Sequence, residues 1–252
     1  MADDSDFVGH LVKFNSLSSG RDKLARLVQY ASKFAWWYLQ KGHFDPNIII
    51  KLKNVDNALS TTRKVLRLGK SIDFLHSALR SIHISDTVLR LTITLSKINQ
   101  ACYLLFDHII WAGRIGIAKV DSAKWKDLSA RFWLVTIILN LIRDVYGMWT
   151  VIIEELRLRN ERASKSHYGN GDVNHKYKTR HIPNDTEVVL SCFQESVPLI
   201  LDFVRNMSDL VLPLAALKRI NASAGVQGAV GVVSSVIGII TTWNPDMRLV
   251  PS

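Results

Sequence analysis

The chain has 252 residues, of which 48% are hydrophobic and 21% charged, and it carries 32 Lys and Arg against 22 Asp and Glu. A net charge of +10 on so apolar a chain favours a protein that works at an anionic surface, either a membrane or a nucleic acid. Two cysteines exclude a disulfide framework, and 13 glycines with 6 prolines exclude collagen-like and low-complexity chains. The acidic first residues lack the basic start and apolar run of a secretory signal.

Apolar residues recur at three- and four-residue steps along almost the whole chain, which predicts helices. Residues 1–97 hold 15 Lys and Arg against 8 Asp and no Glu, so most of the basic excess lies there. We expect residues 1–83 to form amphipathic, membrane-binding helices. One of them begins near Arg21 and ends at Gly42, and the next begins after Asp45 and Pro46.

This next helix is the most amphipathic of the sequence. Its large aliphatic residues fall on one stripe about 100° wide, and they are Val65, Leu68, Ile72, Leu75, Leu79 and Ile82. The basic residues Arg63, Arg67 and Lys70 lie on the opposite side. The pattern fits a core helix with a solvated basic face or a helix at a membrane surface. Nucleic acid is disfavoured because no aromatic residues interleave with the basic ones. Each inserted aliphatic contributes roughly 1.5 kcal/mol, and each Lys or Arg about 1 kcal/mol at an anionic leaflet.

Residues 84–158 are expected to form apolar, membrane-associated helices that contain isolated charges. The uncharged run 132–142 is about half of what a span needs, so no clean span is expected here. Charges in apolar helices usually pair inside a bundle, although they also line proton or ion pathways. The charged residues concerned are Asp107, beside His108, then Arg114, Arg143, Asp144, Asp202, Arg205 and Asp209.

The polar stretch 159–186 is expected to be a flexible linker, and the spacing of its histidines does not suit a metal site. An apolar helix and a C-terminal transmembrane helix are then expected within residues 187–252. The transmembrane helix covers about 222–243, long enough to cross a hydrocarbon core of about 30 Å. A face of small residues lets another helix approach closely in lipid, within the chain or in an oligomer. These residues are Ala224, Gly228, Gly231, Ser235 and Gly238.

No nucleotide-binding loop, nucleophile elbow or zinc-protease motif is found, so the sequence predicts neither an enzyme nor a bound cofactor or metal. Cys102 and Cys192 lie in apolar stretches and are interpreted as packing residues. The expected fold is all-α. It consists of amphipathic N-terminal helices followed by a membrane-associated helical bundle with a C-terminal transmembrane helix.

Several blocks of residues, in order along the chain, resemble the peroxin eleven family of peroxisomal membrane proteins. The blocks are Gly20–Leu24 with Gln29 and Tyr30, Arg63–Lys70, Ile84–Asp86 with Leu89 and Arg90, Asp107–Gly113, Asn140–Asp144, Val204–Asn206 with Asp209 and Pro213, and Gly231–Ser235. The layout is most similar to the animal alpha- and beta-type members. The stretch 159–186 does not match, and the tail lacks the dibasic ending of some members.

The resemblance implies a protein of the peroxisomal membrane, with cytosolic termini, that elongates the membrane by helix insertion and self-association and so promotes peroxisome proliferation and fission. It implies that Arg63, Arg67 and Lys70 contact anionic headgroups. The side chains that it implies to insert are Val65, Leu68, Ile72, Leu75 and Leu79. Gly228, Gly231 and Ser235 would pack against another helix. Implied partners are anionic phospholipids, further copies of the chain, a tail-anchored fission adaptor and a dynamin-related GTPase. The charges within the apolar helices motivate an alternative, a pore for small metabolites.

Overall fold

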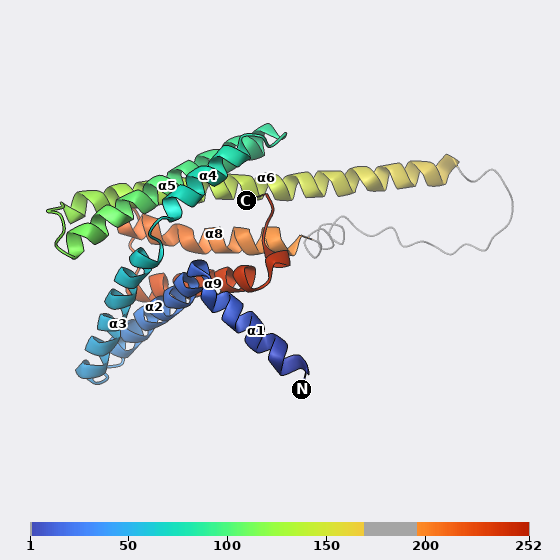
Figure 1. Cartoon of the computed structure of the whole chain (residues 1–252). Helices are drawn as coiled ribbons and strands as arrows, with labels where there is room; N and C mark the ends of the chain where they lie inside the picture. Colours follow the sequence, from blue (N-terminus) through green and yellow to red (C-terminus); the bar gives the residue numbers. More distant parts are fainter. Residues whose placement is uncertain (1, 169–195, 252) are drawn as a thin grey trace.

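The computed structural model describes residues 2–168 and 196–251, including the side chains of residues 7–161 and 196–251, and within these ranges it contains only helices. The all-α prediction is therefore confirmed. Figure 1 shows how the helices are arranged. They are α1 (Ala2–Ser16), α2 (Ser18–Lys41), α3 (Pro46–Leu66), α4 (Lys70–Ser81), α5 (Thr87–Arg114), α6 (Ser122–Tyr168), α8 (Val197–Ala216), α9 (Ala224–Trp243) and the short 3₁₀ helix η1 (Pro245–Met247).

Polar residues cap the beginnings of several helices. The side chain of Asp45 accepts a hydrogen bond from the backbone N–H of Asn47 at α3, and the side chain of Asp86 accepts one from Leu89 at α5. Ser223 caps α9 in the same way. Each cap satisfies a backbone donor that has no partner within its helix, which fixes where the helix begins.

A break at Gly69 corrects the prediction of one continuous amphipathic helix through residues 65–82. Helix α3 ends at Leu66, and α4 begins at Lys70. Gly69 between them has a φ of 81°, a left-handed conformation that glycine adopts without steric cost. The chain can therefore turn here, so α3 and α4 present different faces to the rest of the molecule.

The helices pack side by side in a closed circuit, in which α5, α6, α8, α9, α2 and α3 each contact the next and α3 returns to α5. Helix α4 covers α5 on the outside, and α1 extends from the bundle (Figure 1). The ring of Phe14 in α1 lies 5.5 Å, between centroids, from that of Trp243 at the end of α9. Helix α6 is the long helix beside α5 and α8 in Figure 1.

The C-terminal end of α6 corrects part of the linker prediction. Residues 159–168 continue the helix, whereas residues 169–186 lie outside the described ranges. On the exposed surface of this part, Arg157 and Glu161 form an i,i+4 ion pair of 3.3 Å, a spacing that supports a helix.

Two helices, α6 within Ser122–Glu161 and α9, are long and apolar enough to cross a membrane. The C-terminal one was predicted, and the one in α6 revises the expectation that residues 84–158 contain no clean span. Only 22% and 39% of the two apolar stretches are buried, unlike the core helix of a soluble protein. Arg143 and Asp144, the two charged residues that interrupt the apolar sequence of α6, form an ion pair with each other.

The small-residue face of α9 is occupied by α2 of the same chain. Gly228 lies against the backbone of Phe34, and Gly231 lies against the ring of Tyr30, so that a Cβ atom at either position would stand within 3 Å of α2 atoms. Gly228, Gly231, Ser235 and Gly238 are buried, and Ala224 is half-buried. The face therefore does pack against a helix, but the oligomer contact considered for it is not available without displacing α2.

The distribution of polarity in the bundle is inverted relative to a soluble domain. Among the described side chains, 20 polar or charged residues are buried against 12 hydrophobic ones, whereas large aliphatic residues are exposed on every helix from α1 to α9. A soluble protein buries its aliphatic residues and exposes its charges. Exposure of this many apolar residues fits a surface covered by lipid.

The close contact of α9 with α2 yields a stability prediction. We expect Gly228→Leu to lower the free energy of unfolding by about 1–3 kcal/mol, because the added side chain meets the backbone of α2 and the two helices must separate. Ala229→Leu, on the exposed side of α9, is the control. Denaturant titration in detergent micelles, followed by circular dichroism, measures both. Equal effects of the two variants would contradict the assigned contact.

Candidate functional site

The aliphatic stripe predicted to insert into a membrane lies on the molecular surface. Ile72, Leu75 and Leu79 of α4 are 69%, 45% and 64% exposed. Val65 and Leu68, just before α4, are exposed as well. The opposite face of α4 carries small residues and packs on α5. The stripe is thus an apolar surface that the fold leaves uncovered.

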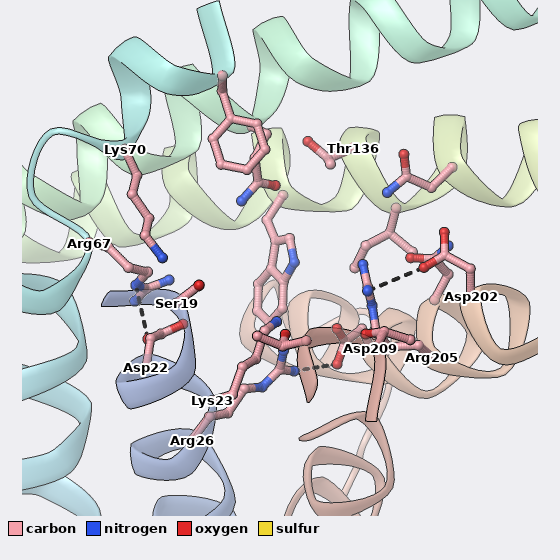
Figure 2. A pocket seen from close by; sticks show the side chains of 18 of the residues that line it. Ser19, Asp22, Lys23, Arg26, Arg67, Lys70, Thr136, Asp202, Arg205 and Asp209 are labelled. Atoms are coloured by element: carbon pink, nitrogen blue, oxygen red, sulfur yellow. Dashed lines mark hydrogen bonds and ion pairs between the residues drawn. The ribbon is translucent and has the colours of Figure 1, made fainter. Parts of the chain in front are cut away.

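The basic residues predicted to accompany the stripe point into the bundle instead. Arg63 is buried, and its Nε donates to Asp22 Oδ1 at 3.1 Å. Arg67, in the turn after α3, donates through Nη2 to Asp107 Oδ2 at 2.8 Å, and Lys70 lines the cavity between the helices (Figure 2). The assignment of these three residues to headgroup contacts is corrected accordingly. The two arginines bind carboxylates within the bundle, and the lysine lines the cavity.

Two carboxylates on α2 and α5 hold the first cluster of buried charge. Asp22 accepts from Arg63 and also lies 3.7 Å from Arg67. Burial alone would raise the pKa of Asp22, but the neighbouring Arg63 and Arg67 guanidiniums lower it below its usual range. Asp107 on α5 pairs with both Lys64 and Arg67. The cluster joins α2, α3 and α5.

The second cluster joins α6 to α8. Arg143 donates to Asp144 Oδ1 at 2.6 Å and to Asp202 on α8. Asn206 donates to the second oxygen of Asp144 at 2.7 Å, and Arg205 lies 3.2 Å from Asp202. The interpretation that charges in the apolar helices pair inside a bundle is confirmed for these residues.

A third pair links α2 to α8, since Arg26 of α2 donates to Asp209 of α8. The sequence did not point to Arg26, nor to Lys23 beside it, as interior residues. The available signal was the polar stripe of α2, in which Asp22, Arg26, Gln29 and Lys33 recur at steps of four and three residues.

A cavity of about 810 Å³ lies between the helices, and every helix of the circuit contributes to its wall. Ten basic residues and three carboxylates line it. The basic residues are Lys23, Arg26, Arg63, Lys64, Arg67, Lys70, Lys97, Arg143, Arg205 and Arg248. The carboxylates are Asp22, Asp202 and Asp209. Figure 2 shows labelled side chains from α2, α4, α6 and α8 around the cavity. A surplus of positive charge in a partly enclosed space attracts anions.

In the described part of the chain, no group of three or more His, Cys, Asp or Glu residues could hold a metal ion. Cys102 is a free, half-buried thiol. The histidines at 175 and 181 and Cys192 lie outside the described residues, and the side chain of His167 is not described either.

Comparison with known proteins now identifies the family. The sequence matches peroxisomal biogenesis factor 11 (PEX11) over residues 8–243, nearly the whole chain. The chain belongs to the PEX11 family. It is 34% identical over 255 residues to human peroxisomal membrane protein 11B, with 95% of this chain and 98% of the relative covered. It is 29% identical to human peroxisomal membrane protein 11A, with 94% and 97% covered, and 26% identical to peroxisomal membrane protein PMP30B of Candida boidinii, with 94% of each covered. No solved structure matches it.

The blocks that carry the resemblance to the PEX11 family supply much of the buried charge. Asp22, Arg63, Asp107, Arg143 and Asp209 all fall within these blocks and all take part in the ion pairs described above. The blocks therefore meet in the interior of the bundle, although Val65 and Leu68 of the exposed stripe also belong to one of them.

Removing one member of the first cluster gives the second prediction. We expect Asp107→Ala to lower the free energy of unfolding by about 3–5 kcal/mol, because it leaves half-buried Lys64 without its carboxylate and Arg67 with only the more distant Asp22. Asp127→Ala removes an exposed carboxylate from an ion pair with Arg131 and should cost about 0–1 kcal/mol. The same denaturant titration in micelles measures both. A loss at Asp107 no larger than at Asp127 would show that the buried cluster does not hold the helices together.

Proposed function

We propose that the protein acts at the peroxisomal membrane, which it remodels and elongates, and that it thereby promotes peroxisome proliferation and fission. Membership of the PEX11 family and the names of its relatives support the organelle and the general role. The observation that carries the mechanism is the exposed aliphatic stripe of Ile72, Leu75 and Leu79 on α4. No catalytic step is part of the proposal.

The dimensions of α4 suit a wedge in one leaflet. With 12 residues it is about 18 Å long, too short to cross a hydrocarbon core of about 30 Å. Asp73, His76 and Arg80 are exposed on the same helix and would remain at the headgroups while the aliphatic side chains enter the acyl region. Area is then added to one leaflet only, which favours curvature towards that side.

The remaining partners follow from the resemblance. In the proposal α6 and α9 anchor the bundle, both termini are cytosolic, and anionic phospholipid attracts the basic N-terminal part. Further copies of the chain gather on the same membrane, where a tail-anchored fission adaptor and a dynamin-related GTPase join them. Because α2 covers the small-residue face of α9, self-association would use another surface.

Replacing an inserted side chain tests the wedge. In vesicles that contain anionic phospholipid, we expect the reconstituted full-length protein to form tubules and Leu75→Glu to remove most of them, since a carboxylate opposes entry into the acyl region. His76→Glu is the matched control, because it adds the same charge at the next exposed position of α4. Electron microscopy measures the number and length of tubules. If Leu75→Glu forms tubules as the wild type does, or His76→Glu loses as many, α4 is not the wedge.

The polar cavity supports a second candidate function, a pore for small metabolites. Its wall is charged while the outside of the bundle is apolar, as in a protein that carries polar solutes across lipid. Conductance of the purified protein in planar bilayers distinguishes the two functions. Stable single-channel currents would favour the pore, and a silent bilayer with intact tubulation would favour the wedge alone.

A further inference from the structure

The cavity between the helices holds more positive charge than its own carboxylates can neutralise. Each of the three lining carboxylates already pairs with arginine: Asp22 with Arg63 and Arg67, Asp202 with Arg143 and Arg205, and Asp209 with Arg26. The other lining basic residues must therefore find their counter-charge elsewhere. A cation that is partly withdrawn from water without one carries a desolvation cost that a bound anion would offset.

Three of these cations have no carboxylate partner. Within residues 7–161 and 196–251, Lys23, Lys70 and Arg248 form no ion pair, although all three line the cavity. Burial, and then the neighbouring Arg205 and Arg26, lower the pKa of Lys23 from its usual value to about 7. Asp22 and Asp209 raise the pKa of Lys23, but by less than the two arginines lower it, so the balance of charge around this amine is positive and would attract a negative ligand.

Lys23 and Lys70 face the same part of the cavity. Both lie close enough to Asp22 to lower the pKa of its carboxyl, and Figure 2 shows the Lys70 amine beside Arg67, whose guanidinium is paired with Asp22. They come from α2 and from the first residue of α4. Two amines that reach one cavity from separate helices are donors of the kind that a phosphate group binds.

The rest of the wall suits an organic body attached to that phosphate. Tyr103 and Trp133 line the cavity and stack on each other with ring centroids 5.7 Å apart. Phe74, Ile93 and Leu104 add apolar wall. A volume of about 810 Å³ lies in the range of sites for small organic ligands, of roughly 300–1,000 Å³.

We propose that this cavity binds a phosphate-bearing organic anion, with Lys23 and Lys70 donating to the phosphate oxygens and Arg248 adding charge at the wall. The shared chemistry is a phosphate ester that carries at least two negative charges. It can come from a soluble nucleotide or from the headgroup of a phosphoinositide lipid. The site lies apart from the aliphatic stripe of α4 and does not depend on membrane insertion by that stripe.

The test uses full-length protein in nanodiscs of neutral phosphatidylcholine, so that the lipid itself supplies no net negative charge. One arm titrates ATP without metal ions by isothermal titration calorimetry. The second arm places a phosphatidylinositol bisphosphate in the nanodisc and measures the rise in unfolding temperature that binding to the folded state produces. Binding in the first arm assigns a soluble ligand, and stabilisation in the second arm assigns a lipid headgroup.

The variants remove charge without stranding a carboxylate. Lys23→Met with Lys70→Met keeps the length of both side chains, and we expect it to weaken binding about 100-fold, roughly ten-fold for each lost charge-assisted hydrogen bond. Lys23→Arg with Lys70→Arg should retain most of the affinity. The control, Lys13→Met with Lys51→Met, removes two exposed lysines outside the cavity wall and should bind as the wild type does.

Three results would overturn the proposal: no binding in either arm by the wild type, unchanged affinity in the Lys23 and Lys70 methionine variant, or an equal loss in the Lys13 and Lys51 control. Circular dichroism establishes that each variant is folded, and the wild-type titration decides the matter if the methionine variant is not. Vesicle tubulation by the Lys23 and Lys70 variant, with Leu75 intact, separates a failure of this site from a failure of the wedge.

Discussion

The need to pair charge inside an apolar shell governs this structure. Four pairs, Asp22 with Arg63, Arg26 with Asp209, Arg67 with Asp107 and Arg143 with Asp202, each join residues that lie 40 or more positions apart in the sequence. Together they tie α2 to α3 and α8, the turn after α3 to α5, and α6 to α8. In a bundle surrounded by lipid, an Arg or Asp between the helices is poorly hydrated and is stabilised by an opposite charge. Each pair therefore favours one choice of neighbouring helices. The small residues of α9 complete the circuit, because only they allow the backbone of α2 to approach so closely.

Buried ion pairs are not in themselves a large source of stability. The attraction within a pair roughly offsets the desolvation of its members, whereas loss of one member is costly. Their contribution is therefore the choice of one arrangement over others. Dispersion contacts between helices, such as Gly228 against Phe34, stabilise whichever arrangement the charges select. This division explains how a bundle with 20 buried polar residues and only 12 buried hydrophobic ones still has one defined set of helix contacts.

The sequence predicted which kinds of residue share a helix face better than it predicted which face points into the bundle. Helical periodicity, the aliphatic stripe of α4 and the small-residue face of α9 were all evident, because they depend only on spacing. The burial of Arg63 and Arg67 was missed because a basic face points outward in water and inward when lipid surrounds the bundle. The spacing of residues along a helix does not show whether water or lipid surrounds it. The break at Gly69 was missed because a single glycine in a helical pattern is compatible with both a turn and a continuous helix. In α6, Arg143 and Asp144 concealed a candidate span because Arg143 also pairs with Asp202, 59 residues further along the chain.

The recognisable residues of the PEX11 family and the lipid-facing residues answer to different physical demands. In the proposed wedge lipid requires only that a surface be apolar, so Ile72, Leu75 and Leu79 could be exchanged for other large aliphatics with little effect on insertion. A buried pair of Asp and Arg requires the carboxylate and the guanidinium at hydrogen-bond distance. Replacing the Arg by Lys or the Asp by Glu would change that hydrogen-bond geometry. The blocks that carry the resemblance include Asp22, Arg63 and Asp107. Of the exposed stripe they include Val65 and Leu68 and leave out the exposed residues of α4. Lys70 stands at the boundary between the two surfaces. It is the last residue of its block and the first of α4, and its side chain lines the cavity while Ile72, two positions on, faces outward. The orientation of the exposed stripe is therefore set by the same turn that directs positive charge into the bundle.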